Sequence, residues 1–343
     1  MFARITLLIL ICAMWGCQEP QTLPEPQITP FPLTSSVRAI QVLDAETVWF
    51  TGTGGQFGYT EDGGENWQID SVRVDSVLPE FRALRIVKDT VLLMSVATPA
   101  LMMRSEDKGI SWEVVYKEDH LSCYYNSMSF WDHKNGMAVG DPTDSCLSII
   151  LTEDGGKSWY KRSCENIPPL ISGEAQFAAS NTNVVIQGED TWLVTGAAAA
   201  RVFHSSNRTQ SWEVYDTPIQ QGGQMTGIFS AAFHGTEKGL LFGGDWENQA
   251  DNHGNKAITK DGGKTWELIT DGEGPGYRSC VQYQPGTNGE VVWAVGKPGM
   301  SYSSDGGHSW TELGQEGFYT IRFTEDGKHA WLAGRNIIGS MSW

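Results

Sequence analysis

Six copies of one short motif, Ser/Thr-x-Asp-x-Gly-x-x-Trp, run along this chain of 343 residues. Successive copies lie 44 to 54 residues apart, and an interval of this length is typical of one four-stranded blade of a β-propeller. The third and last positions of the copies are Asp62 and Trp67, Asp107 and Trp112, Asp154 and Trp159, Asn207 and Trp212, Asp261 and Trp266, and Asp305 and Trp310. The repeat therefore predicts a ring of similar β-sheets.

The chemistry of the motif is that of a tight β-hairpin. An Asp side chain accepts hydrogen bonds from nearby backbone N–H groups, Gly adopts the left-handed conformation, and Trp covers the turn with apolar surface. Six copies that are one blade apart cannot meet at one catalytic or metal site. The fourth copy, with Asn207 and Thr209 in place of Asp and Gly, also favours a structural role.

Short β-rich runs that end in glycine precede most copies, for example VWFTG ending at Gly52 and VWAVG ending at Gly296. These runs predict second strands, and alternating runs before them predict first strands. Seven such units fit the chain, the last of them from about Gly317 to Trp343 without a motif. We expect residues around Gln27 to Leu33 to supply its missing outer strand. The prediction is a single all-β, seven-bladed propeller over residues 35–343.

The N-terminus has the pattern of a lipoprotein-type signal peptide over residues 1–17. A positive start and a short apolar core lead to Gly16-Cys17, and Cys17 is the predicted lipidation site. Residues 18–34 are rich in proline and predict an extended tether. We therefore expect an exported protein of the bacterial cell envelope, periplasmic or surface-facing, that contacts the membrane only through its lipid.

Charge and cysteine content narrow the possible partners. The formal net charge of −17 disfavours nucleic acid and anionic membrane surfaces. One disulfide is expected among Cys123, Cys146 and Cys164, with the pairing open, whereas Cys280 fits a buried thiol in an inner strand. Spaced histidines and the lack of a CxxC motif predict no metal and no cofactor, although the oxygen-rich loop 245–255 is a weaker candidate for calcium. We expect a monomer.

Several segments resemble a known family. The motifs are those of Asp-box, or BNR, repeats, and runs such as FWDHKNGMAVGDP from Phe130, GEAQFAAS from Gly173 and GYRSCVQYQPG from Gly276 are similar to secreted, single-propeller bacterial proteins akin to photosystem II stability and assembly factors. Some of these WD40/YVTN/BNR-like repeat proteins carry the label oxidoreductase. No dinucleotide, flavin or haem motif in this sequence supports that chemistry. The resemblance implies a propeller that binds or assembles proteins.

Candidate site residues are expected at the mouth of the central channel, on the face opposite the motif turns. The longer loops between repeats gather there, and long loops on one face are often retained for binding. The polar residues predicted to surround this mouth are Arg38, Arg82, Asn126, Asp141, Glu174, Asp245, Arg278 and Tyr319. They suit a carboxylate, a glycan or a partner's side chain, and the alternative is a water-filled polar lining.

The function expected from these features is that of a non-enzymatic binding or assembly scaffold for an envelope protein or a glycan. The alternative is a sialidase-like glycoside hydrolase, in which arginines clamp a carboxylate and Asp141, Glu174, Asp245 and Tyr277 supply the catalytic groups. The Arg-Ile-Pro sequence that is typical of sialidases is absent, and xyloglucanase-type enzymes with similar repeats use two propellers. Both points favour the scaffold.

Overall fold

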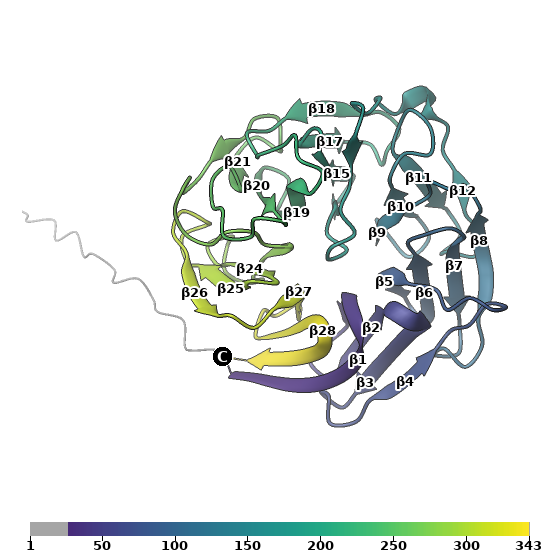
Figure 1. Ribbon diagram of the computed structural model, residues 1–343. Coiled ribbons are helices and arrows are strands. Elements are labelled where there is room, and N and C mark those ends of the chain that lie inside the picture. Colours follow the sequence, from purple (N-terminus) through teal and green to yellow (C-terminus); the bar gives the residue numbers. More distant parts are fainter. Residues whose placement is uncertain (1–26, 343) are drawn as a thin grey trace, which may run out of the picture.

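In the computed structural model, which describes residues 27–342, short antiparallel strands surround a central axis (Figure 1). The predicted all-β propeller is therefore confirmed. Two single-turn 3₁₀ helices, η1 (Thr53–Gly55) and η2 (Cys164–Asn166), interrupt the strands. None of the helices in this described part of the chain is long and apolar enough to cross a membrane.

The predicted count of seven blades is wrong, because the strands form six hydrogen-bonded sheets. Four of the sheets have four strands each: β5 (Phe81–Val87), β6 (Thr90–Ser95), β7 (Ala100–Ser105) and β8 (Glu113–Glu118); β9 (Tyr125–Phe130), β10 (Gly136–Gly140), β11 (Ser148–Thr152) and β12 (Tyr160–Lys161); β14 (Val184–Gln187), β15 (Asp190–Val194), β17 (Arg201–Ser205) and β18 (Glu213–Asp216); and β23 (Cys280–Tyr283), β24 (Val292–Gly296), β25 (Gly299–Ser303) and β26 (Thr311–Gly314).

The other two sheets have six strands each. The first has the order β27 (Phe318–Phe323), β28 (His329–Ser342), β1 (Gln27–Val42), β2 (Thr47–Gly52), β3 (Gln56–Glu61) and β4 (Gln68–Ser71). The second has the order β13 (Glu174–Ala175), β16 (Gly196–Ala197), β19 (Thr226–His234), β20 (Lys238–Asp245), β21 (Lys256–Thr259) and β22 (Glu267–Leu268).

A single long strand explains the first six-stranded sheet. Residues 27–32 of β1 pair antiparallel with β28, and residues 37–42 of the same strand pair with β2. The two ends of the chain therefore close the ring within one sheet, which removes two exposed edges. Residues 27–34 of the predicted tether belong to β1, whereas the signal peptide, Cys17 and the rest of the tether lie outside the described residues.

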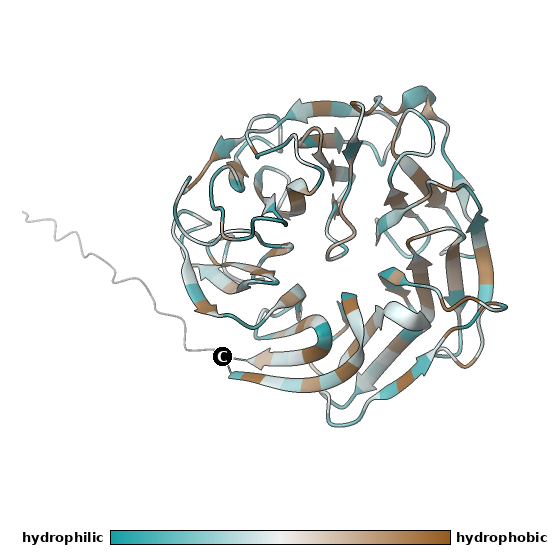
Figure 2. Cartoon of the chain, in the orientation of Figure 1, coloured by the Kyte–Doolittle hydropathy of each residue, from teal (hydrophilic) through white to brown (hydrophobic). Residues whose placement is uncertain are grey.

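The apolar core lies between neighbouring sheets. Strands carry most of the hydrophobic residues and the connecting loops are more hydrophilic (Figure 2). One core cluster joins Trp192 of β15 to Ile228, Ala231 and Phe233 of β19, and its members are at most 6% exposed. Because every pair of adjacent sheets packs in this way, burial of side chains fixes the sheets around the axis.

The six motif turns share one hydrogen-bond pattern. The hydroxyl of the first residue donates to the Asp or Asn side chain at 2.7–3.0 Å and accepts the N–H of the fifth residue at 2.8–2.9 Å. The Asp or Asn side chain also accepts the N–H of the seventh residue at 2.8–3.0 Å. Asn207 preserves both contacts in the fourth turn, although Thr209 must adopt a φ of 67°. The carboxylates at these turns are therefore occupied in holding the backbone.

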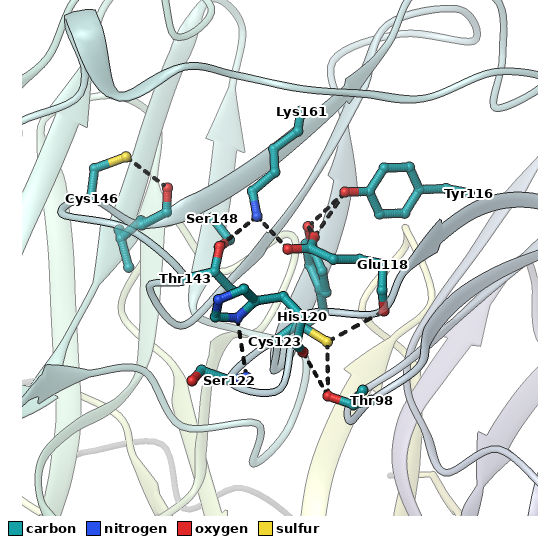
Figure 3. Close-up of polar contacts among 12 residues, drawn as sticks. Thr98, Tyr116, Glu118, His120, Ser122, Cys123, Thr143, Cys146, Ser148 and Lys161 are labelled. Atoms are coloured by element: carbon teal, nitrogen blue, oxygen red, sulfur yellow. Dashed lines mark hydrogen bonds and ion pairs between the residues drawn. The ribbon is translucent and has the colours of Figure 1, made fainter.

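Cysteine chemistry follows the prediction and settles the open pairing. Cys146 and Cys164 form the disulfide, while Cys123 and Cys280 are buried free thiols. The Cys123 thiol lies 3.4 Å from Thr98 Oγ1 in a polar cluster between β8 and β12 (Figure 3). In that cluster burial acts to raise the pKa of Glu118, but hydrogen bonds from Lys161, Tyr125 and Tyr116 outweigh it and leave the pKa below its usual value.

Removal of this disulfide is expected to lower the free energy of unfolding by about 3 kcal/mol, because a cross-link over 18 residues restricts the unfolded chain. The test is urea denaturation of Cys146→Ala/Cys164→Ala beside the oxidised wild type. Reduced wild-type protein is the matched control and should unfold near the double variant. Equal midpoints for the oxidised protein and the double variant would contradict the expectation.

Candidate functional site

A β-bulge recurs near the point where five inner strands begin or end their pairing with the next strand of the sheet. The ladder skips one residue in each of β1, β5, β9, β19 and β27, and the skipped residues are Arg38, Arg82, Asn126, Phe229 and Tyr319. A bulge turns the side chain of the extra residue away from the regular alternation of a strand. Four of the predicted site residues occupy these positions, so a shared backbone feature directs them towards one end of the axis.

The chain itself crosses the axis between β13 and β14. We call residues 176–183 the axial segment, which is the teal loop that projects into the ring in Figure 1. Its backbone carbonyls accept hydrogen bonds from Arg82 (Ala178 O, 2.9 Å) and Arg322 (Ser180 O, 2.9 Å). Its side chains bond to further inner strands, as Thr182 Oγ1 does to Ser230 Oγ at 2.8 Å. The axial segment therefore separates one mouth of the channel from the other.

On the face opposite the motif turns, a cavity of about 660 Å³ opens among the loops. We call it the loop-face pocket. Its polar lining includes Arg38, Arg82 and Asp141, and its apolar lining includes Phe177, Met225, Phe229, Trp246 and Tyr277. A pocket with a few polar groups on an apolar wall is the usual form of a ligand site.

Two arginines supply the positive charge of this pocket. Arg38 donates to Ala179 O at 3.3 Å and stacks over the ring of Tyr319, with 4.1 Å between the guanidinium carbon and the ring centroid. Arg82 donates from Nε to Glu80 at 2.8 Å. Burial, and after it the charge of Arg82, lower the pKa of Arg38 below its usual value. Glu80 forms an ion pair with Arg82 through Nε and Nη2, so this carboxylate compensates part of the charge of the pair. Arg38 has no carboxylate partner among the described residues and is the cation most open to an anionic ligand.

Asp141 is the one predicted carboxylate that lines the pocket. Its Oδ1 accepts hydrogen bonds from Gln176 N at 2.8 Å and Asn126 Nδ2 at 3.2 Å. Burial raises the pKa of Asp141 to about 6 in spite of these two bonds. Asp141 is held in place in the lining of the pocket and gains a proton as the pH falls through about 6.

Three other predicted residues are directed elsewhere. The Glu174 carboxylate is fully buried in an ion pair with Arg201 and accepts from Thr195 Oγ1 at 2.6 Å. Arg278 points between strands, where it donates to Tyr277 O at 2.9 Å and Ser301 Oγ at 2.8 Å. Asp245, the last residue of β20, accepts the N–H of Glu247 at 2.7 Å and does not line the pocket. Of the three arginines predicted at the mouth, only Arg38 and Arg82 line the pocket.

The alternative function, a glycoside hydrolase, would need a second carboxylate beside Asp141. Glu174 does not supply it, because its side chain is buried in the ion pair with Arg201. Tyr277 does line the pocket, but burial raises its pKa far above the ordinary value, so its phenol stays protonated at neutral pH. Within residues 27–342, no three His, Cys, Asp or Glu side chains gather as a metal site, and this holds for the loop 245–255.

Some residues of the pocket had no clear signal in the sequence. Phe177 and Phe229 stack with 3.9 Å between ring centroids, and Phe229 and Tyr277 form a T-shaped pair. Trp246, which is 42% exposed, stands at the rim beside Lys297. Phe229 occupies the same bulge position as the predicted arginines, and alignment of the inner strands on that position would have found it.

No family model and no curated protein matches this sequence. Among solved structures, YCF48 bound to a D1 peptide is similar, with 16% identity, a TM-score of 0.69 and coverage of 94% of this chain and 96% of that one. YCF48 from Cyanidioschyzon merolae has 18% identity and a TM-score of 0.64 over 93% and 98% of the chains. A GH74 xyloglucanase from Xanthomonas campestris has 14% identity and a TM-score of 0.66, over 92% of this chain but 53% of the enzyme. These similarities agree with the expected resemblance at the level of the fold, which is that of a β-propeller.

Proposed function

We propose that this protein is a non-enzymatic binding or assembly scaffold that holds an acidic, extended segment of a partner protein in the loop-face pocket. The observation that carries the proposal is the pair Arg38 and Arg82, which are brought together by two bulges beside an apolar wall. A guanidinium binds a carboxylate through charge-assisted hydrogen bonds. The wall of Phe177, Met225 and Trp246 suits an apolar side chain next to that carboxylate.

The geometry favours a peptide over a glycan. Exposed tryptophan and arginine are the residues that most often dominate protein interfaces, and Trp246 stands at the rim of this pocket. YCF48, which has the same fold, binds a D1 peptide. A lipid anchor at Cys17 and export to the cell envelope are part of the same proposal, since a tethered propeller would present this face to an envelope protein.

The test of this proposal is the removal of one arginine of the pair. Peptides selected from a displayed library by the purified propeller are expected to be enriched in Asp or Glu next to an aromatic or aliphatic residue. Arg82→Met is expected to weaken the binding of a selected peptide about 10-fold to 100-fold, because one charge-assisted hydrogen bond contributes about 1.5–3 kcal/mol. Isothermal titration calorimetry measures the change.

Arg335→Met is the matched control, because it removes the same charge at an exposed position outside the pocket. It should bind the peptide like the wild type. Equal affinity of Arg82→Met and wild type would overturn the placement of the ligand. Release of sugar from a panel of glycosides, abolished by Asp141→Asn, would instead establish the glycoside hydrolase.

A further inference from the structure

The opposite mouth of the channel holds a second cavity of about 660 Å³. We call it the turn-face pocket, because Gly235 of the β19–β20 turn lines it, and the backbone carbonyl of Glu237, two residues later, accepts a hydrogen bond from Gly262 N of a motif turn. The axial segment divides it from the loop-face pocket: Phe177 to Ala179 line one cavity, and Asn181 and Thr182 line the other. The two cavities are therefore separate sites.

Two arginines face this second cavity without a carboxylate. Arg85 of β5 and Arg322 of β27 line it, as does His234, and its lining contains no Asp or Glu from the described residues. Such a lining is unexpected in a chain with a formal net charge of −17. Several arginines elsewhere have acidic partners: Arg104 pairs with Glu106 and Glu113, and Arg208 with Asp132 and Glu189.

Arg322 and Arg85 differ in how many hydrogen bonds they already form within the protein. Arg322 is fixed by the axial segment, because its Nη2 donates to Ser180 O at 2.9 Å and to Asn181 O at 3.2 Å. Arg85 Nε is buried and has no hydrogen-bond partner among residues 27–342. Burial, followed by the positive charge of Arg322, lowers the pKa of Arg85. Two neighbouring, partly desolvated cations with one unused donor form an arrangement that an oxyanion would stabilise.

Amide side chains complete the lining. Gln282 Nε2 donates to Val281 O at 2.7 Å and Gln187 Nε2 to Phe233 O at 3.3 Å, which leaves their side-chain oxygens to accept hydrogen bonds from a ligand. The cavity is much larger than a single carboxylate or phosphate group, because one water occupies about 30 Å³ of liquid volume. The space therefore suits an anion that also carries hydroxyl groups.

We propose that the turn-face pocket binds a small hydroxylated organic anion, with its carboxylate or phosphate held between Arg85 and Arg322. The site is independent of the peptide site, because the axial segment lies between them. Binding would also stabilise the fold, since an anion that binds only the folded state raises its stability by mass action.

The test is thermal unfolding of the purified protein in sodium gluconate or glycerol 3-phosphate, each compared with sodium chloride of equal ionic strength. One or both organic anions are expected to raise the unfolding midpoint, and the stronger response identifies carboxylate or phosphate as the preferred group. Arg85→Met is expected to weaken the apparent affinity at least tenfold. In sodium chloride its midpoint should not fall, because the substitution removes a half-buried cation that has no ion-pair partner among the described residues.

Two controls place the site. Arg82→Met, in the loop-face pocket, and Arg73→Met, at an exposed position, should retain the full response to the anion. A midpoint that depends on ionic strength alone would overturn the proposal. So would an unchanged response in Arg85→Met, or a response that Arg82→Met abolishes and Arg85→Met retains.

Discussion

Glu174→Ala is expected to lower the free energy of unfolding by about 3–5 kcal/mol, because it removes a fully buried carboxylate and leaves the Arg201 guanidinium, whose side chain is 13% exposed, without its partner. The carboxylate also accepts hydrogen bonds from Ile171 N at 2.9 Å and Thr195 Oγ1 at 2.6 Å. Its loss therefore frees donors on three segments that support β13 and the start of the axial segment. Urea denaturation followed by tryptophan fluorescence measures the change.

The double variant Glu174→Met/Arg201→Met distinguishes a lost charge pair from a lost side-chain volume. Apolar replacement of both partners is often neutral, so the double variant should recover a large part of the stability. Glu325→Ala, at an exposed position, is the matched control and should unfold like the wild type. A stable Glu174→Ala protein that had lost an activity would contradict the structural role and return Glu174 to the site.

The sequence could predict the sheets because the motif turns are local. Thr60, Asp62 and Gly64 form their hydrogen bonds within a few residues, so the pattern of side chains is enough to identify the turn. The number of blades could not be predicted from the local sequence pattern, because it depends on pairing between distant segments. The pairing of residues 27–32 with β28 agrees with the expected outer strand of the last unit. That the same strand runs on into its pairing with β2, and so joins two units in one sheet, depends on long-range hydrogen bonds that no single repeat contains.

The interruption of the fourth inner strand has a similar cause. Residues 173–187 look like the other first-strand regions, but only two short parts of them form strands. β13 pairs with β16 and β14 pairs with β15, and the residues between β13 and β14 cross the axis. Asn183 and Ser180 replace ladder contacts with side-chain bonds to Ser127 and Ser279. Such bonds depend on the width of the finished ring, which the sequence of one repeat does not contain.

Predicted residues line the loop-face pocket where position along a strand determines the orientation of the side chain. Arg38 and Arg82 share the bulge position, and Asp141 directly follows the second-strand glycine, so all three lie at the same mouth. Arg278 comes before the first paired residue of β23, where no bulge directs its side chain to the axis. The turn-face arginines Arg85 and Arg322 had no signal in the sequence, because the longer loops that mark a candidate site lie at the other mouth of the channel.

Trp192→Ala is expected to lower the free energy of unfolding by about 3–5 kcal/mol, the usual loss when a large buried aromatic side chain is truncated. The indole is fully buried, stacks on Phe233 with 3.9 Å between ring centroids, and lies against the His204 ring. Its Nε1 donates to Gly262 O of a motif turn at 2.8 Å, so the variant leaves both a cavity and an unpaired buried carbonyl. Urea denaturation checks the value.

Trp246→Ala is the matched control, because that indole is 42% exposed at the rim of the loop-face pocket. We expect the opposite effects from it, with unfolding nearly unchanged and peptide binding weakened. Similar losses of stability in both variants would show that Trp246 belongs to the core rather than to the binding surface.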